Sequence, residues 1–127
     1  MITFKRVYEP AAGQDGWRVL ADRLWPRGVS KSSLTMDEWC RDITPSAELR
    51  QAYHHQLIDF QTFGERYLAE LTHPEAEDCL RRLALKASTG NLTLLSAVKS
   101  PQTSHIPWLT RVLEQHIRLL NDGLTEQ

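Results

Sequence analysis

The sequence predicts a single compact α/β domain in which a small, mostly parallel sheet is packed by about five helices. Strand-like segments come first, at residues 2–8 and 17–21, helical periodicity fills the middle, and a short apolar run at 92–98 precedes a closing helix. The 127 residues suffice for one domain over 1–127, and 41% hydrophobic with 24% charged residues is ordinary globular composition.

The first part of the chain is expected to form strands joined by ordered loops. Residues 2–8 alternate apolar and polar side chains, which is typical of a strand. A proline and an Asp-Gly pair within 9–16 indicate a turn-rich connection to the second strand, 17–21. Residues 23–33 show no periodicity and contain a Pro-Arg-Gly segment, so we expect an ordered loop in which a buried Trp25 anchors a tight turn that aims Arg27.

Helical spacing begins at Ser33 and recurs through the rest of the chain. The apolar face of the first expected helix comprises Met36, Trp39, Cys40 and Ile43. Further helices are expected from about Thr44, over 57–71, from Pro74 to a stop at Gly90, and over 108–120. The apolar run 92–98 between the last two helices has the length and character of a buried strand.

The cysteines and the N-terminus indicate a cytoplasmic protein without metal or cofactor. Cys40 and Cys79 are far apart, with no Cys-x-x-Cys or Cys/His cluster around either, which argues against a zinc ribbon or a disulfide-framed secreted domain. Both fall on expected apolar helix faces, so we interpret them as small buried hydrophobic residues. The N-terminus does not resemble a signal peptide, and 92–98 is too short to span a bilayer, so no membrane partner is expected.

Residues 17–31 concentrate positive charge in a nearly neutral chain. They carry Arg18, Arg23, Arg27 and Lys31 against Asp22 alone, a local charge of +3 where the whole chain has −1. Arginines on a rigid loop after a strand are well placed to bind phosphate or carboxylate oxygens. Asp22 either orients a guanidinium or acts as acid or base. The alternative is structural: Trp25 fills the core, the turn positions the chain, and Asp22 pairs with an arginine.

Lys99 is a second candidate because it follows the buried strand 92–98 directly. Ligands of open parallel sheets bind at the carboxyl ends of strands. If 17–21 and 92–98 run parallel, then Asp22, Arg23, Arg27 and Lys99 share one edge and converge on one pocket. The alternative for Lys99 is an ordinary solvated lysine at a strand end.

Several segments together resemble the YeaO-like family, a domain of unknown function. They are Arg6–Pro10, Asp15–Leu20, Asp22–Gly28 with Lys31, Pro45–Arg50, Phe60–Tyr67 with Glu70 and Leu71, and Leu92–Leu95 with Lys99. The resemblance implies a small cytosolic α/β protein and supplies no reaction. It maps the family's polar signature onto Asp22, Arg23, Arg27, Lys31, Arg50, His55 and Lys99. The chain departs from the family's pattern at His54, Gln56, Ser96, Ser100 and Ser104, which implies weakened or altered activity. The arginine-rich half of the pattern is intact, which favours retained binding over retained chemistry.

These observations favour a site for a small anionic ligand, phosphate-bearing ligands included, with or without hydrolysis. The ligand-binding residues would be Arg23, Arg27, Lys31, Arg50 and Lys99, with Asp22 and His55 as acid or base. A nucleic-acid-binding module that uses the same basic loop, with Trp17 and Trp25 for stacking, is the alternative, although the net charge of −1 disfavours it. An interaction protein without catalysis also remains open. The sequence does not indicate an oligomeric state.

Overall fold

The computed structural model describes residues 1–125 and contains a four-stranded sheet in the order β1-β4-β2-β3. The strands are β1 (Ile2–Arg6), β2 (Trp17–Leu20), β3 (Glu38–Trp39) and β4 (Leu92–Ser96). All three strand pairings are parallel, with Ile2 opposite Leu92, Val19 opposite Leu94 and Val19 opposite Glu38. The expected parallel relation between β2 and β4 is therefore confirmed.

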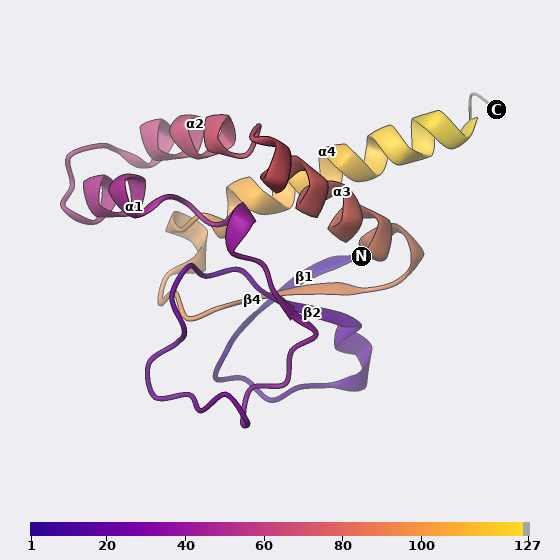
Figure 1. Ribbon diagram of the computed structural model, residues 1–127, viewed down its shortest axis with the longest axis horizontal. Coiled ribbons are helices and arrows are strands. Elements are labelled where there is room, and N and C mark those ends of the chain that lie inside the picture. The colour runs from indigo at the N-terminus through magenta and orange to yellow at the C-terminus, as the bar shows by residue number, and fades with distance from the viewer. Residues whose placement is uncertain (126–127) are drawn as a thin grey trace.

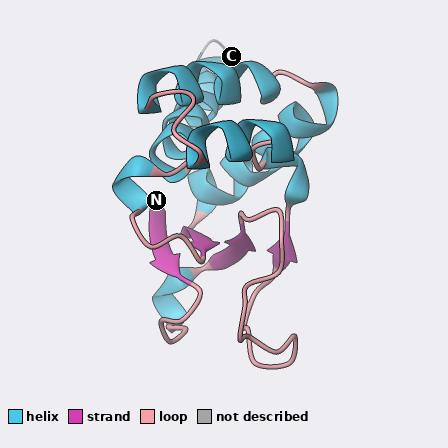
Figure 2. Cartoon of the chain, turned by 90° about the vertical axis from the view of Figure 1, so that its left-hand side faces the viewer, coloured by secondary structure: helices cyan, strands magenta, loops and turns pink. Residues whose placement is uncertain are grey.

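Helices gather on one side of this sheet, as Figures 1 and 2 show. They are α1 (Ala47–His54), α2 (Phe60–Glu70), α3 (Pro74–Thr89) and α4 (Ile106–Thr125), and short 3-10 turns occupy 13–15, 41–43 and 101–103. The starts of α1, α2 and α3 have local causes. Ser46 and Asp59 accept hydrogen bonds from first-turn amides of α1 and α2, and Pro74 lies in the first turn of α3. None of the described helices is long and apolar enough to cross a membrane.

The two faces of the sheet are covered differently. On the helix side, Val19, Leu92 and Leu94 pack against α2, α3 and α4 in the larger hydrophobic cluster. On the other side, Leu20 and Leu95 pack beneath the long loop between β2 and β3, and Figure 2 shows loops and one short helical turn there in place of α-helices. All residues of β4 are buried, as expected for a central strand covered on both faces. At the carboxyl ends of β2 and β4, the sheet is thus bordered by loops from its helix side and from its loop side.

The helix expected from Ser33 is wrong, and the described chain has four α-helices where about five were expected. Residues 33–43 form loop, the short strand β3 and a 3-10 turn. Trp39 packs in the loop-side cluster, whereas Cys40 and Ile43 pack in the helix-side cluster. The apolar residues that share one helical face in sequence therefore serve opposite faces of the sheet, which an extended segment at the sheet edge achieves and a helix does not.

The expectation that the cysteines are separate residues is also wrong. Cys40 and Cys79 are buried, as expected, but they are bonded as a disulfide that joins the residue after β3 to the inner face of α3. Their sequence separation of 39 residues gives no indication of this pairing. The neighbouring Glu38 carboxylate accepts hydrogen bonds from Trp17 at 2.8 Å and from Arg82 at 2.5 Å, which adds a polar link between the sheet edge and α3.

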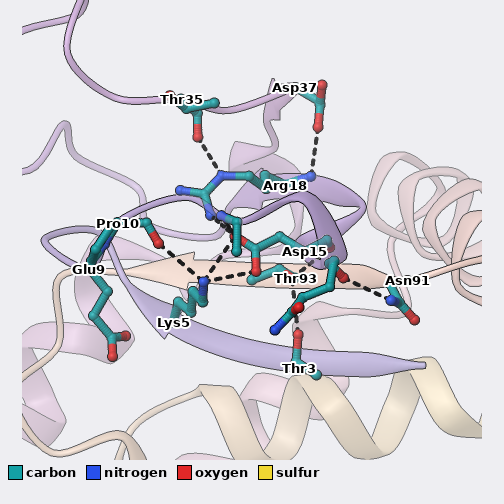
Figure 3. Close-up of polar contacts among 12 residues, drawn as sticks. Thr3, Lys5, Glu9, Pro10, Asp15, Arg18, Thr35, Asp37, Asn91 and Thr93 are labelled. Carbon is teal, nitrogen blue, oxygen red and sulfur yellow. Dashed lines mark hydrogen bonds and ion pairs between the residues drawn. The ribbon is translucent and has the colours of Figure 1, made fainter.

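A buried polar cluster occupies the loop side of β1 and β2 (Figure 3). The Asp15 carboxylate lies 2.9 Å from the Lys5 ammonium and also binds the guanidinium of Arg18. The hydrogen bond from Lys5, together with others from the Ala12 amide and Arg18, lowers the pKa of Asp15 to about 2. Thr93 of β4 donates to the Asp15 carbonyl at 2.7 Å. Arg18, which contributes to the basic stretch in sequence, is thus a buried structural residue.

Candidate functional site

The carboxyl ends of β2 and β4 open into one cavity of about 690 Å³. Because the two strands are parallel neighbours, the segments that follow them, 21–27 and 97–100, line the cavity together. Helix α1 and the segment 103–105 before α4 contribute further lining. The cavity is therefore at the edge where ligands of parallel sheets bind.

Positive charge dominates the ionisable groups around this cavity. Its lining includes Arg23, Arg27, Arg50 and Lys99, with Asp22 as its carboxylate. These four cations against one carboxylate leave a formal charge of +3, whereas the whole chain carries −1. Asp22, Arg23, Arg27 and Lys99 were expected to share a pocket from their positions after the strands, and the structure brings them together.

Two of the residues predicted for the site lie outside the cavity lining. Lys31 is exposed in the loop after the turn at residues 27–28. His55 is exposed at the end of α1, and its neighbour His54 lines the cavity instead. Successive residues of a helix point about 100° apart, so one of two adjacent histidines faces a given cavity. The sequence alone left the choice between them open.

Asp22 fastens the ends of β2 and β4 to each other. One of its carboxylate oxygens accepts a hydrogen bond from the Ser96 hydroxyl at 2.6 Å, and the other accepts from the Ala97 amide at 2.7 Å. Its backbone carbonyl accepts from the Trp39 indole at 2.7 Å. Ser96 is one of the departures from the family pattern, and here its hydroxyl serves this link. These contacts hold the ends of β2 and β4 together beside the cavity.

The four lining cations divide into one that is tethered and three that are not. Arg23 donates from Nε to the Pro45 carbonyl at 2.9 Å, and so holds the segment before α1. The side chains of Arg27, Arg50 and Lys99 are exposed and make no hydrogen bond or ion pair with any residue in the described part of the chain. Three of the lining cations thus have no ion-pair partner within residues 1–125.

The loop that presents Arg27 is held by aromatic contacts. Trp25 donates from its indole nitrogen to the Val29 carbonyl at 2.6 Å and meets Trp39 edge-on at 5.4 Å. Gly28 adopts a φ of 76°, the left-handed conformation that a tight turn requires. The expected turn is confirmed, although Trp25 is half-buried where a fully buried anchor was expected.

His105 is the cavity residue that the sequence analysis missed. Its Nε2 lies 2.6 Å from the Ala21 carbonyl, which only accepts, so Nε2 carries the proton. The same nitrogen is 3.8 Å from an Asp22 carboxylate oxygen. Burial lowers the pKa of His105 and keeps the ring neutral near pH 7. Lys99 was predicted from the rule that ligands of parallel sheets bind at the carboxyl ends of strands, which we call the strand-end rule. The same rule applies to His105, since this residue lies in the loop that follows β4.

Trp17, offered above as a stacking residue, lies at the opposite end of β2 from the cavity. The Lys86 ammonium is 4.1 Å from its ring centroid, and its indole nitrogen donates to Glu38. Trp17 and Trp25 therefore do not form one stacking platform beside the basic loop.

Fold and site together define a class: a small parallel α/β domain with a cationic cavity at the carboxyl edge of its sheet. Residues 1–126 match the family model described as "Inactive DUF488-N3 subclade", and the chain belongs to this family. It is 51% identical over 104 residues to the uncharacterized protein YeaO of Escherichia coli (strain K12), covering 82% of this chain and 89% of YeaO.

The chain is also similar to a mycobacterial protein. The chain is 40% identical over 108 residues to the uncharacterized protein Rv3073c of Mycobacterium tuberculosis (strain ATCC 25618 / H37Rv), covering 85% of this chain and 89% of that protein. No solved structure matches the chain. The resemblance to the YeaO-like family is thus confirmed.

Proposed function

We propose that this protein binds a small anionic ligand in the cavity between β2, β4 and α1, in the cytosol and without turning the ligand over. One observation carries the proposal: Arg27, Arg50 and Lys99 line one cavity and have no internal partner among the described residues. A charge of +3 confined to a concave site attracts anions and raises their local concentration.

The chemistry of these cations favours oxygen anions. Guanidinium groups form paired hydrogen bonds to phosphate and carboxylate oxygens, and an ammonium adds a mobile point charge. A bound anion supplies the negative charge that Arg27, Arg50 and Lys99 do not find in the described part of the protein. Arg23 contributes to the positive potential, while its bonds to the segment before α1 keep it in place.

The contacts of the titratable groups favour binding over catalysis. Both carboxylate oxygens of Asp22 already accept hydrogen bonds, and the protonated nitrogen of His105 faces a backbone carbonyl. His55 lies outside the cavity lining. The description of the family model contains the word "Inactive", which agrees with a site that binds without reacting. This proposal therefore gives Asp22 a positioning role.

The test is thermal stability against inorganic phosphate concentration, with ionic strength held constant by sodium chloride. Binding to the folded state alone stabilises it by about 2.7 kcal/mol when the ligand is at a hundred times its Kd. Arg27→Ala and Lys99→Ala should each weaken this stabilisation. Arg118→Ala, which removes an exposed cation from α4 far along the chain, is the control and should respond as the wild type does. Equal responses in all four proteins would reduce the effect to general salt stabilisation and refute the site.

A further inference from the structure

The same cavity offers apolar surface well beyond what an inorganic anion contacts. Leu24, Trp25, Tyr53, Phe63 and Val98 contribute to its lining beside the cations. Its volume of about 690 Å³ is within the range of roughly 300–1,000 Å³ that is typical of sites for organic ligands. A lone tetrahedral anion at the cations would leave most of this space and its apolar lining in contact with water.

We infer that the ligand is an organic anion whose charged group is attached to an aromatic ring; this inference rests on the proposed function. Sites for such molecules combine a mostly apolar lining with a few polar groups that fix orientation. Here Arg27, Arg50 and Lys99 are the orienting groups, and the apolar residues of the lining are the surface for the ring.

The aromatic part of the lining is rigid. The rings of Tyr53 and Phe63 stack with centroids 4.4 Å apart and an interplanar angle of 14°. Tyr53 donates its hydroxyl proton to the Thr103 carbonyl at 2.7 Å, which links α1 to the turn before α4 across the cavity rim. The phenol is thus committed to the protein. Phe63 is buried, so the ring surface available to a ligand comes mainly from the half-buried Tyr53, which Phe63 holds in place. Flat aromatic groups suit such a surface because ring pairs stack or meet edge-on.

Among the large apolar residues of the lining, Leu24 is the one that is exposed. It lies between Arg23 and Trp25 in the cavity lining, yet 65% of its surface is exposed to solvent. A ring held in the cavity beside Arg27 would remove part of this surface from water, which is favourable in proportion to the apolar area covered. Because the side chain is so exposed, Leu24→Ser changes the lining while the core stays as it is.

The experiment compares Kd values for phenyl phosphate, inorganic phosphate and phenol, measured by titration calorimetry at constant ionic strength. We expect phenyl phosphate to bind at least about tenfold tighter than inorganic phosphate, and phenol to bind more weakly than phenyl phosphate. Leu24→Ser should reduce the ratio of phenyl phosphate affinity to phosphate affinity severalfold. Leu119→Ser, which changes a leucine of α4 that is 67% exposed, is the matched control and should keep the wild-type ratio.

The outcomes separate this inference from the proposed function. If inorganic phosphate binds and phenyl phosphate binds no tighter, the aromatic class is overturned while the anion site stands. Equal losses in Leu24→Ser and Leu119→Ser would also overturn it, because the ring would then not be held at the cavity. If neither anion binds, the proposed function fails and this inference fails with it.

Discussion

Replacing Gly64 with alanine tests the contact between α2 and α4 beside the cavity. Gly64 lies inside α2, next to the cavity residue Phe63. A Cβ atom at Gly64 would lie 2.1 Å from Cε2 and 2.2 Å from Cζ2 of the Trp108 indole, which is buried at the start of α4. Alanine normally stabilises a helix interior relative to glycine, so the contact and the helix propensity predict opposite signs.

The magnitudes decide the sign. Helix propensity favours alanine over glycine by about 1 kcal/mol. Carbon atoms pack at about 3.5–4.0 Å, so the indole or α2 must move by more than about 1 Å, and overpacking of this kind costs about 1–3 kcal/mol or more. The indole has little freedom to move because it packs against Phe60 with centroids 5.2 Å apart. Subtracting the propensity gain from this cost, we expect Gly64→Ala to lower the free energy of unfolding by up to about 2 kcal/mol.

Urea denaturation followed by fluorescence and circular dichroism measures this change. Gly123→Ala is the control, because a Cβ there meets no atom within 4 Å in α4, and it should be neutral or stabilising by up to about 1 kcal/mol. In the background of Trp108→Leu, Gly64→Ala should cost less than in the wild type. A Gly64→Ala protein as stable as Gly123→Ala would refute the close approach of the two helices.

Further predictions concern the polar links and the disulfide. Asp22→Asn should cost about 1–3 kcal/mol, because the amide nitrogen cannot accept the bond that the carboxylate now takes from Ser96 or Ala97; unchanged stability in urea would contradict the link between β2 and β4. The folded-state pKa of Asp15 is about 2 and its ordinary value is 3.8, so its stabilisation is complete above pH 4 and is lost as the pH falls toward 2. The stability difference between wild type and Asp15→Asn should therefore shrink over that interval, and a constant difference would contradict the pKa shift. Reducing the disulfide should destabilise the protein by about 2–4 kcal/mol, as expected for a closed loop with a separation of 39 residues, whereas Cys79→Ala should be insensitive to reductant. Equal sensitivity of both proteins to dithiothreitol would show that the bond does not stabilise the fold.

The strand-end rule predicted much of the site because it depends on local patterns. The run 92–98 and the segment 17–21 are recognisable as strands from their own residues, and parallel pairing then places Asp22 and Lys99 at one edge. The same rule applies to His105, but the 3-10 turn at 101–103 separates this residue from β4, so the strand pattern alone does not point to it. The rule predicts the location of a site from the ends of the strands. It does not predict the chemistry of the ligand, which is the subject of the proposal above.

What the sequence could not predict depends on contacts across the fold. Trp39 and Cys40 are adjacent, yet they pack on opposite faces of the sheet, and that choice exists only once both layers are in place. The bond between Cys40 and Cys79 likewise depends on how α3 lies against the sheet. Helical spacing in 33–43 was therefore a correct description of the pattern and a wrong prediction of the structure.

The order of the strands has a consequence for how the chain is made. The first strand, β1, pairs with β4, whose residues follow some ninety positions later, and β2 also needs β4 for its main partner. At about 5–20 residues per second, β4 emerges from the ribosome on the order of 5–20 s after β1. During that interval Ile2 and Phe4 have no sheet to join. During synthesis β1 therefore waits without a strand partner and with its two apolar side chains uncovered, which is the kind of segment that molecular chaperones capture.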